Sequence, residues 1–268
     1  MIKNRKTIVF TSLMLIGTLG YAHEFWLEPM KFILKENEKV LVNLMVGEDY
    51  QGEHSNGLKY KIQKLDQYSG NTPTDIRATV KGDSLSTFDI AFSKPGNHLI
   101  AFNNTSKFIG LESEKFNDYL RSEGLDEILK LRLQKGDTLK TGRELYQRCV
   151  KTLVQVGGKN DQTFAVNTGM KLEIIPKTNP YNVTEKTPVI FKILFQQKPV
   201  KNGLVLAWHV QNGKATHQKL RSNAAGEVTF PISKTGKWMI STVNMTAHIN
   251  STEADWQSYW GSYTFGFY

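Results

Sequence analysis

The chain alternates between apolar and polar residues over short stretches, which is typical of strands in half-buried sheets. In KVLVNLMVG, every second residue from Val40 to Val46 is apolar, and Gly47 ends the run. TDIRATVKG, STFDIAF and NHLIAF follow, with KPGN as a turn between the last two. The spacing therefore predicts a β-hairpin over residues 86–103.

Helical periodicity occurs in one stretch, SEKFNDYLRSEGLDEILKLRLQKG. Ser113 is the expected N-cap, and the apolar pattern breaks at Gly124 before it resumes. We therefore expect two short helices within residues 113–135. A long strand over about residues 146–156 should follow them.

The second half has the pattern of an immunoglobulin-like or transthyretin-like sandwich. PVIFKILFQQKPVKNGLVLAWHV and NAAGEVTFPISKTGKWMISTVNM each contain two strands joined by a turn, and SYTFGFY closes the chain. The polar stretch GGKNDQTFAVNTG separates this half from the first. The sequence thus predicts a mainly β fold of two β-sandwich-like domains, 23–165 with the helical insertion and 170–268.

Residues 1–22 are typical of a secretory leader. A short basic segment with Lys3, Arg5 and Lys6 precedes an apolar run, and Gly20-Tyr21-Ala22 provides a cleavage site after Ala22. The apolar run is shorter than the roughly 20 residues that a membrane span requires. We expect an exported chain that is not embedded in the membrane after cleavage, and the alternative is a retained N-terminal anchor.

Charge and cysteine usage narrow the function classes. The net charge of +9 falls to +6 when the three basic leader residues are removed (9 − 3 = 6), and no block of like charges concentrates it. We therefore expect no nucleic-acid partner. Cys149 is the single cysteine, so an intramolecular disulfide is impossible. A small buried residue explains Cys149 better than a catalytic thiol.

The residue after the cleavage site could carry metal chemistry. If His23 becomes the first residue, its α-amine and Nδ1 can chelate one ion, because an α-amine with a pKa near ~8 can lose its proton to a metal. A further imidazole would complete a T-shaped histidine brace, which suits Cu(II) or Ni(II). The alternative is that a histidine stands at this position by chance.

Further candidate ligands come from two other stretches. His248 precedes Asp255 in MTAHINSTEADWQSYWGSYTF, and a histidine near a carboxylate can supply two ligands or one ligand and its orienting partner. Glu53 and His54 in GEDYQGEHSNG could add ligands, although a solvated loop is the simpler explanation. The aromatic residues after Asp255 are expected to plug the end of the sandwich. We treat His209 and His217 as structural, and His98 as structural or a second-rank ligand.

Several phrases together resemble a family of bacterial periplasmic proteins classed under a domain of unknown function. They are AHEFWLEP, GEDYQGE, SKPGNHLIAF, FNDYLRSEGLDEI, ELYQRCVKTLVQVG, LEIIPKTNP, GKWMI and ADWQSYWGSYTF. The resemblance implies an all-β, two-part periplasmic protein that supports nickel or cobalt uptake, with an inner-membrane metal transporter as its partner. His23, His248 and Asp255 are the polar positions that match the family pattern.

The leading hypothesis is therefore a periplasmic protein that binds a divalent transition metal, Ni, Co or Cu, and has no catalytic residues. His23 would chelate the ion, His248 would add an imidazole, and Asp255 or Glu53 would add an oxygen. A second hypothesis is a histidine-brace copper oxidase that acts on polysaccharide through an aromatic face. A third is a metal-free interaction module of the cell envelope.

Overall fold

The computed structural model describes residues 24–185, 187–248 and 251–268, which form a mainly β fold as the sequence predicts. Its central sheet has the strand order β17-β16-β19-β20-β12-β10-β6-β7, and β2 and β11 also pair with β12. The strands are β2 (Ile33–Leu34), β6 (Ile62–Ser69), β7 (Thr72–Asp75), β10 (Gly96–Asn104), β11 (Lys107–Leu111), β12 (Gly142–Val156), β16 (Leu204–Gln211), β17 (Lys214–Arg221), β19 (Lys237–Ala247) and β20 (Trp256–Gly266).

Two smaller sheets cover the central sheet. The N-terminal outer sheet consists of β1 (Glu24–Pro29), β3 (Lys39–Glu48), β4 (Gln51–His54) and β9 (Thr87–Ala91). The C-terminal outer sheet consists of β13 (Leu172–Pro176), β14 (Thr187–Phe195), β15 (Lys198–Pro199) and β18 (Glu227–Ile232). A separate ribbon pairs β5 (Gly57–Leu58) with β8 (Ser84–Leu85). Short 3-10 turns cover Lys59–Lys61, Arg77–Thr79, Thr163–Ala165 and Pro180–Asn182.

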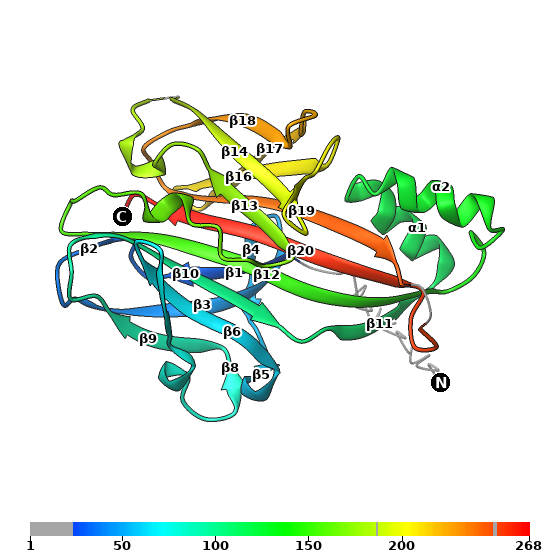
Figure 1. The fold of residues 1–268 in the computed structure, drawn as a ribbon, viewed down its shortest axis with the longest axis horizontal. Coiled ribbons are helices and arrows are strands. Elements are labelled where there is room, and N and C mark those ends of the chain that lie inside the picture. The colour runs from blue at the N-terminus through cyan, green and yellow to red at the C-terminus, as the bar shows by residue number, and fades with distance from the viewer. Residues whose placement is uncertain (1–23, 186, 249–250) are drawn as a thin grey trace, which may run out of the picture.

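The side-chain alternation of the central strands explains the layered arrangement. On β10, Leu99 packs in the core beneath the C-terminal outer sheet, whereas Ile100 packs in the core beneath the N-terminal outer sheet. On β12, Leu153 and Val154 divide between the same two cores. Successive residues of a strand point to opposite faces, so both faces of the central sheet are buried here. Figure 1 shows the two outer sheets above and below the long strands β12 and β20.

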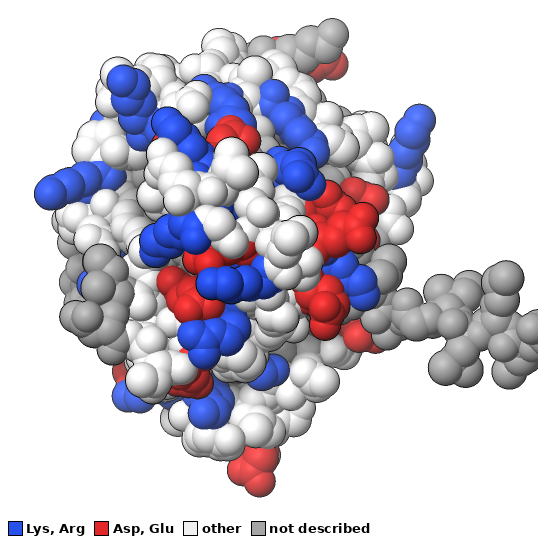
Figure 2. Space-filling view, turned by 90° about the vertical axis from the view of Figure 1, so that its right-hand side faces the viewer, with Lys and Arg blue, Asp and Glu red and all other residues white. Residues whose placement is uncertain are grey.

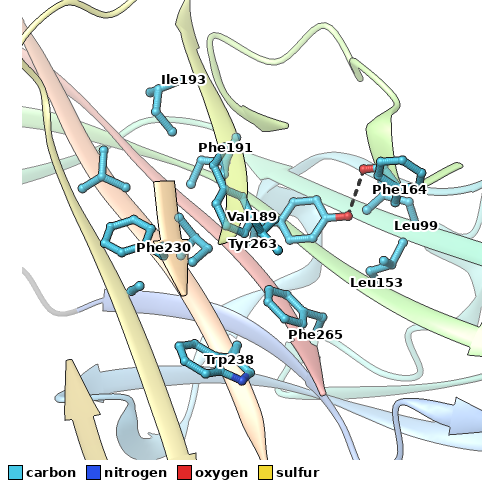
Figure 3. Packing of buried hydrophobic residues seen from close by; sticks show 14 of the residues in the cluster. Leu99, Leu153, Phe164, Val189, Phe191, Ile193, Phe230, Trp238, Tyr263 and Phe265 are labelled. Carbon is cyan, nitrogen blue, oxygen red and sulfur yellow. Dashed lines mark hydrogen bonds between the residues drawn. The ribbon is translucent and has the colours of Figure 1, made fainter. Parts of the chain in front are cut away.

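Aromatic and branched side chains fill the core beneath the C-terminal outer sheet. Figure 3 shows Phe191 and Phe230 facing Tyr263 and Phe265 of β20, and the Tyr263 hydroxyl donates to the Phe164 carbonyl at 3.0 Å. Cys149 is buried in this core, and burial raises the pKa of its thiol to about 11. Its predicted role as a small buried residue is therefore confirmed.

The helical insertion has the predicted form, α1 (Ser113–Ser122) followed by α2 (Asp126–Gln134). Ser113 is the first helical residue rather than the N-cap, which is Glu112. A Schellman motif ends α1, because Leu125 N–H bonds to Leu120 O at 2.8 Å and Gly124 N–H bonds to Arg121 O at 3.1 Å. Gly124 has a φ of +66°, which a glycine adopts without strain. The motif fixes Glu123 as the last residue before the turn.

The predicted hairpin over residues 86–103 is wrong. β9 pairs with β3 in the N-terminal outer sheet, whereas β10 pairs with β6 and β12 in the central sheet. The turn between them carries the chain from one layer to the next. The predicted boundary between residues 165 and 170 stays a prediction, and the central sheet takes strands from both sides of it.

The surface around the helices carries both signs of charge. Figure 2 views the molecule from the side where α1 and α2 lie, and Lys and Arg are interspersed with Asp and Glu across this face. Across residues 24–185, 187–248 and 251–268, no helix has the length and apolar character needed to cross a membrane.

Candidate functional site

His23 lies outside the described residues, so its chelate stays a prediction. The description begins at the next residue, Glu24, which opens β1. Glu24 directly follows His23 in the sequence, so the carboxylate of Glu24 is a candidate partner for a metal held by His23.

His248 and Asp255 face each other across the loop between β19 and β20. The His248 backbone N–H donates to the Asp255 carbonyl at 2.8 Å. The Asp255 carboxylate accepts two hydrogen bonds from Arg143, at 3.1 and 2.8 Å, and Arg143 holds the pKa of this carboxyl below its usual range. The structure thus brings these two residues together, with the Asp255 side chain occupied by an ion pair.

Glu53 and His54 are exposed neighbours on β4. Because they are consecutive in a strand, their side chains point to opposite faces. β4 lies in the N-terminal outer sheet, away from the β19–β20 loop (Figure 1). Within the described part of the chain, no group of three or more His, Cys, Asp or Glu side chains could by itself hold a metal ion.

A buried carboxylate that the sequence interpretation missed lies at the start of β1. Glu24 Oε1 accepts a hydrogen bond from Ser241 Oγ of β19 at 2.8 Å. Glu24 Oε2 is buried and has no hydrogen-bond partner among the described residues. Burial raises the pKa of Glu24 to about 7, against the opposing hydrogen bonds from Ser241, Trp208 and the Tyr50 backbone. The side chain can therefore be protonated or ionised near neutral pH.

A second carboxylate, Glu123 at the end of α1, faces Glu24. Burial raises the pKa of Glu123 to about 7, and the charge of Glu24 adds to this effect. Both residues line one small cavity together with Ser241, Thr242 and Trp260. The volume that the centre of a water molecule can occupy inside this cavity is about 10 Å³. This is close to the space that one water molecule needs, so the cavity has room for a single water or ion.

A hydrogen-bond network lies on the other side of Trp260. Glu144 is fully buried, and its Oε1 accepts hydrogen bonds from Ser258 Oγ and, at 3.3 Å, from Tyr119 OH. Trp260 Nε1 donates to Ser258 Oγ at 3.1 Å. Burial raises the pKa of Glu144 to about 7. This network holds the indole that forms one wall of the Glu24–Glu123 cavity.

The other candidate residues have structural roles. Trp256 and Trp260 are 2% and 4% exposed and pack against α1 and α2, as expected for a buried plug. His98 is buried between Gln67 and the Lys94 carbonyl, each at 2.8 Å, and burial lowers its pKa. His209 stacks on Trp238 at 4.1 Å, and His217 packs against Trp208.

Two carboxylates, Glu24 and Glu123, line one small cavity at the start of β1, and Oε2 of Glu24 has no hydrogen-bond partner among the described residues. Carboxylate oxygens are ligands for divalent cations, and an imidazole or amine nitrogen next to them would suit a transition metal. Signals for this pair existed in the sequence, since Glu24 opens an apolar strand and Glu123 precedes a helix-ending glycine.

Comparison with known families matches residues 20–246 to a domain of unknown function, DUF4198. The chain belongs to the DUF4198 family. The DUF4198 match includes Glu24, Glu123 and Ser241, whereas His248 and Asp255 lie beyond its end. No curated protein matches the chain.

Several solved structures show a weak likeness. Alpha-2-macroglobulin from Escherichia coli, activated by porcine elastase, is 9% identical with a TM-score of 0.23, over 91% of this chain and 20% of that one. A Salmonella alpha-2-macroglobulin mutant is 8% identical with a TM-score of 0.24, over 97% and 16%. Three domains of the bacteriophage RB49 outer capsid protein Hoc are 9% identical with a TM-score of 0.20, over 90% and 59%. The chain spans less than two thirds of each structure, and these scores carry no functional argument.

Proposed function

We propose that this DUF4198 protein binds a divalent transition metal in the periplasm and supports nickel or cobalt uptake through an inner-membrane transporter. The proposed centre joins His23 to the Glu24–Glu123 pair. The observation that carries the proposal is the buried Oε2 of Glu24, which has no hydrogen-bond partner among the described residues and shares a cavity of one-ion size with Glu123.

Electrostatics supports a cation at this place. Burying a carboxylate without a partner costs free energy, and a protein minimises the cost by protonating the group or pairing it. Glu24 and Glu123 both have a pKa of about 7, so two protons or one divalent cation would neutralise the pair. A bound metal would be held by carboxylate oxygens of Glu24 and Glu123 and by nitrogens of His23.

The site predicted from sequence changes in one respect. His248 lies seven positions after Ser241, which bonds Glu24, and one residue beyond the end of β19. At about 3.3 Å per residue, this separation is roughly 20 Å. We therefore propose Glu24 and Glu123, rather than His248 and Asp255, as the partners of His23.

The polysaccharide-oxidase hypothesis finds no support in the arrangement of the aromatic residues. It requires a flat aromatic face that is open to substrate. Trp256 and Trp260 are instead buried against the helices, and Tyr259 packs on Phe195 at 5.2 Å between ring centroids.

The test is calorimetric titration of processed protein that begins at His23 with Ni(II), Co(II), Cu(II) and Zn(II). We expect Glu24→Gln and Glu123→Gln each to weaken binding about tenfold or more, since each removes one charged ligand. Glu28→Gln on the same strand and His248→Ala are the matched controls and should keep the affinity. One extra residue ahead of His23 should also weaken binding.

The pH dependence gives a second readout. Metal binding must displace the protons of Glu24, Glu123 and the His23 α-amine, so the affinity should rise with pH through about 7 and level off only above the amine pKa near ~8. No binding of any of the four ions, or full affinity in Glu24→Gln and Glu123→Gln, would overturn the proposed centre. Weakening by His248→Ala alone would return the site to the β19–β20 loop.

A further inference from the structure

A larger cavity lies on the far side of β1 from Glu24. It has a volume of about 530 Å³ and is bordered by β1, the β5–β8 ribbon, the turn after β10 and the first half of β12. Small-molecule sites typically measure about 300–1,000 Å³. The cavity contains neither Glu24 nor Glu123, so it is separate from the proposed metal centre.

A guanidinium group lies at the inner end of this cavity. Arg148 is only 7% exposed, and its guanidinium carbon lies 5.4 Å from the Phe25 ring centroid and 5.0 Å from that of Tyr146. Trp260 contacts the same group at 5.3 Å. Aromatic faces hold a guanidinium in a fixed plane, and arginine keeps its charge even where burial opposes it. Glu144 and the Tyr146 hydroxyl also act on Arg148 and favour its charged form, so the inner end of the cavity carries a positive charge that the protein itself offsets in part.

The rim of the cavity adds further positive charge. Lys61 and Lys107 are exposed at its mouth, and no Asp or Glu occurs among the described residues that line it. Thr105 also lines the cavity, and its Oγ1 is buried without a hydrogen-bond partner in the described part of the chain. A hydroxyl of this kind can donate to an oxyanion.

The walls between the charged groups are apolar. Tyr60 is 72% exposed and Leu58 is 43% exposed, although both border a concave surface. Phe25 and Phe102 lie deeper in the same cavity. Exposed apolar side chains around a cavity with a few convergent polar groups are typical of ligand sites.

We propose that this cavity binds a small aromatic carboxylate. The carboxylate lies on the side of Arg148 and Thr105, and the ring lies against Tyr60 and Phe25. Arginine and a hydroxyl recognise a carboxylate through charge-assisted hydrogen bonds. A neutral ligand forgoes this charge pairing, and a cation meets repulsion from Arg148, Lys61 and Lys107.

The test uses 2-naphthoate as the probe, 2-naphthamide as its neutral analogue, and processed protein in buffer with EDTA, so that no metal bridges the carboxylate. We expect naphthoate to bind at least about tenfold more tightly than the amide, because only the carboxylate pairs with Arg148. Glu24→Gln with Glu123→Gln should bind naphthoate as the wild type does. This keeps the result independent of the metal proposal.

Variants of exposed rim residues locate the binding without risk to the fold. Lys61→Gln and Lys107→Gln should each weaken naphthoate binding about threefold, as expected for screened surface charges. Lys198→Gln is the matched control, because it removes the same charge from exposed β15. Tyr60→Ala should weaken naphthoate and naphthamide alike, since it removes ring contact and no charge.

Three results would overturn the proposal. The first is equal affinity for naphthoate and naphthamide. The second is an effect of Lys198→Gln as large as that of Lys61→Gln, which would indicate only general attraction to a basic protein. The third is absence of naphthoate binding to the wild type.

Discussion

The two ends of β1 place a carboxylate in opposite environments, one with a cationic partner and one without. Glu24 and Glu28 lie four residues apart and therefore point to the same face of the strand. Glu28 accepts hydrogen bonds from Lys237 Nζ at 2.6 Å and from Trp26 Nε1 at 2.7 Å. Glu24 meets Ser241 in the corresponding place on β19, and its second oxygen has no partner within the described residues.

The difference follows from one pair of positions on β19. Residues 237 and 241 are also four apart, so the two strands present the same spacing at both ends. A lysine neutralises Glu28, whereas a serine leaves the charge of Glu24 in place. Elsewhere in the core, buried Glu173 is paired with Lys151, whereas buried Glu144 accepts hydrogen bonds from Ser258 and Tyr119. Glu24 shares with Glu144 a raised pKa and a second oxygen without a partner among the described residues, but it also lies beside a second carboxylate, Glu123. This pairing of two carboxylates is what favours a cation from outside the chain.

The largest expected effect is a pH dependence of stability that comes from Glu24 and Glu123. Unfolded carboxyls release their protons near ~4.3, whereas the folded pair holds protons up to a pKa of about 7. Between these values the unfolded state binds fewer protons, so the free energy of unfolding falls as pH rises, and it levels off above about 7. Replacing both residues with Gln should remove this loss.

The measurement is urea unfolding of metal-free wild type and Glu24→Gln/Glu123→Gln at several pH values. The difference in the free energy of unfolding should grow by about 3 kcal/mol in favour of the variant between pH ~5 and ~8, after allowance for partial exposure. Glu253→Gln, an exposed carboxylate near the chain end, serves as the control. A difference that stays flat with pH would show that the pair is ionised like surface residues.

At the other end of β1, where Glu28 is paired with Lys237, a substitution that removes the charge of Lys237 should lower the stability of the protein. Lys237→Met leaves Glu28 partly buried without its cation, and the side chains are only 16% and 19% exposed. We expect a loss of about 2 kcal/mol, below the ~3–5 kcal/mol typical of fully buried pairs. Chemical unfolding near neutral pH measures it.

A double variant separates charge from packing at this end. Lys237→Met/Glu28→Gln should recover most of the stability that Lys237→Met loses, because it removes the unpaired charge. If both variants are equally unstable, the stem of Lys237 stabilises the protein through packing on Tyr50, which its ammonium approaches to 4.6 Å.

The contrast also shows what the sequence could and could not predict about the fold. Short alternating runs identified most of the strands and the break at Gly124 identified the two helices, because both signals are local. The strand predicted over TDIRATVKG is wrong, since β7 ends at Asp75 and a 3-10 turn follows at Arg77–Thr79. Local sequence signals could not predict which strands pair with each other. β9 and β10 are joined by a good turn sequence and still enter different sheets, since β10 is apolar on both faces and must be covered on both sides.

The site was harder to predict for a related reason. The sequence suggested ligands that are close together along the chain, such as His248 with Asp255. In the structure, Arg143 of β12, which is far from Asp255 in the sequence, forms an ion pair with Asp255. Glu24 and Glu123 are 99 residues apart (123 − 24 = 99), so no spacing rule connects them. Their meeting depends on the packing of α1 beside β1 and β19, which is a tertiary property.

The smallest expected effect concerns the hydrogen bond that Ser241 donates to Glu24. Ser241→Ala removes the donor to Glu24 Oε1 and should cost about 1 kcal/mol in the free energy of unfolding. It should also raise the pKa of Glu24 further, since this hydrogen bond opposes the effect of burial. Ser262→Ala is the matched control, because it removes a hydrogen bond of the same 2.8 Å length to the Phe25 carbonyl without touching a carboxylate. An NMR titration of the Glu24 carboxyl carbon measures the shift. A pKa that does not move in Ser241→Ala would mean that Ser241 only fills space beside Glu24, and the two ends of β1 would then differ more sharply than the hydrogen bonds indicate.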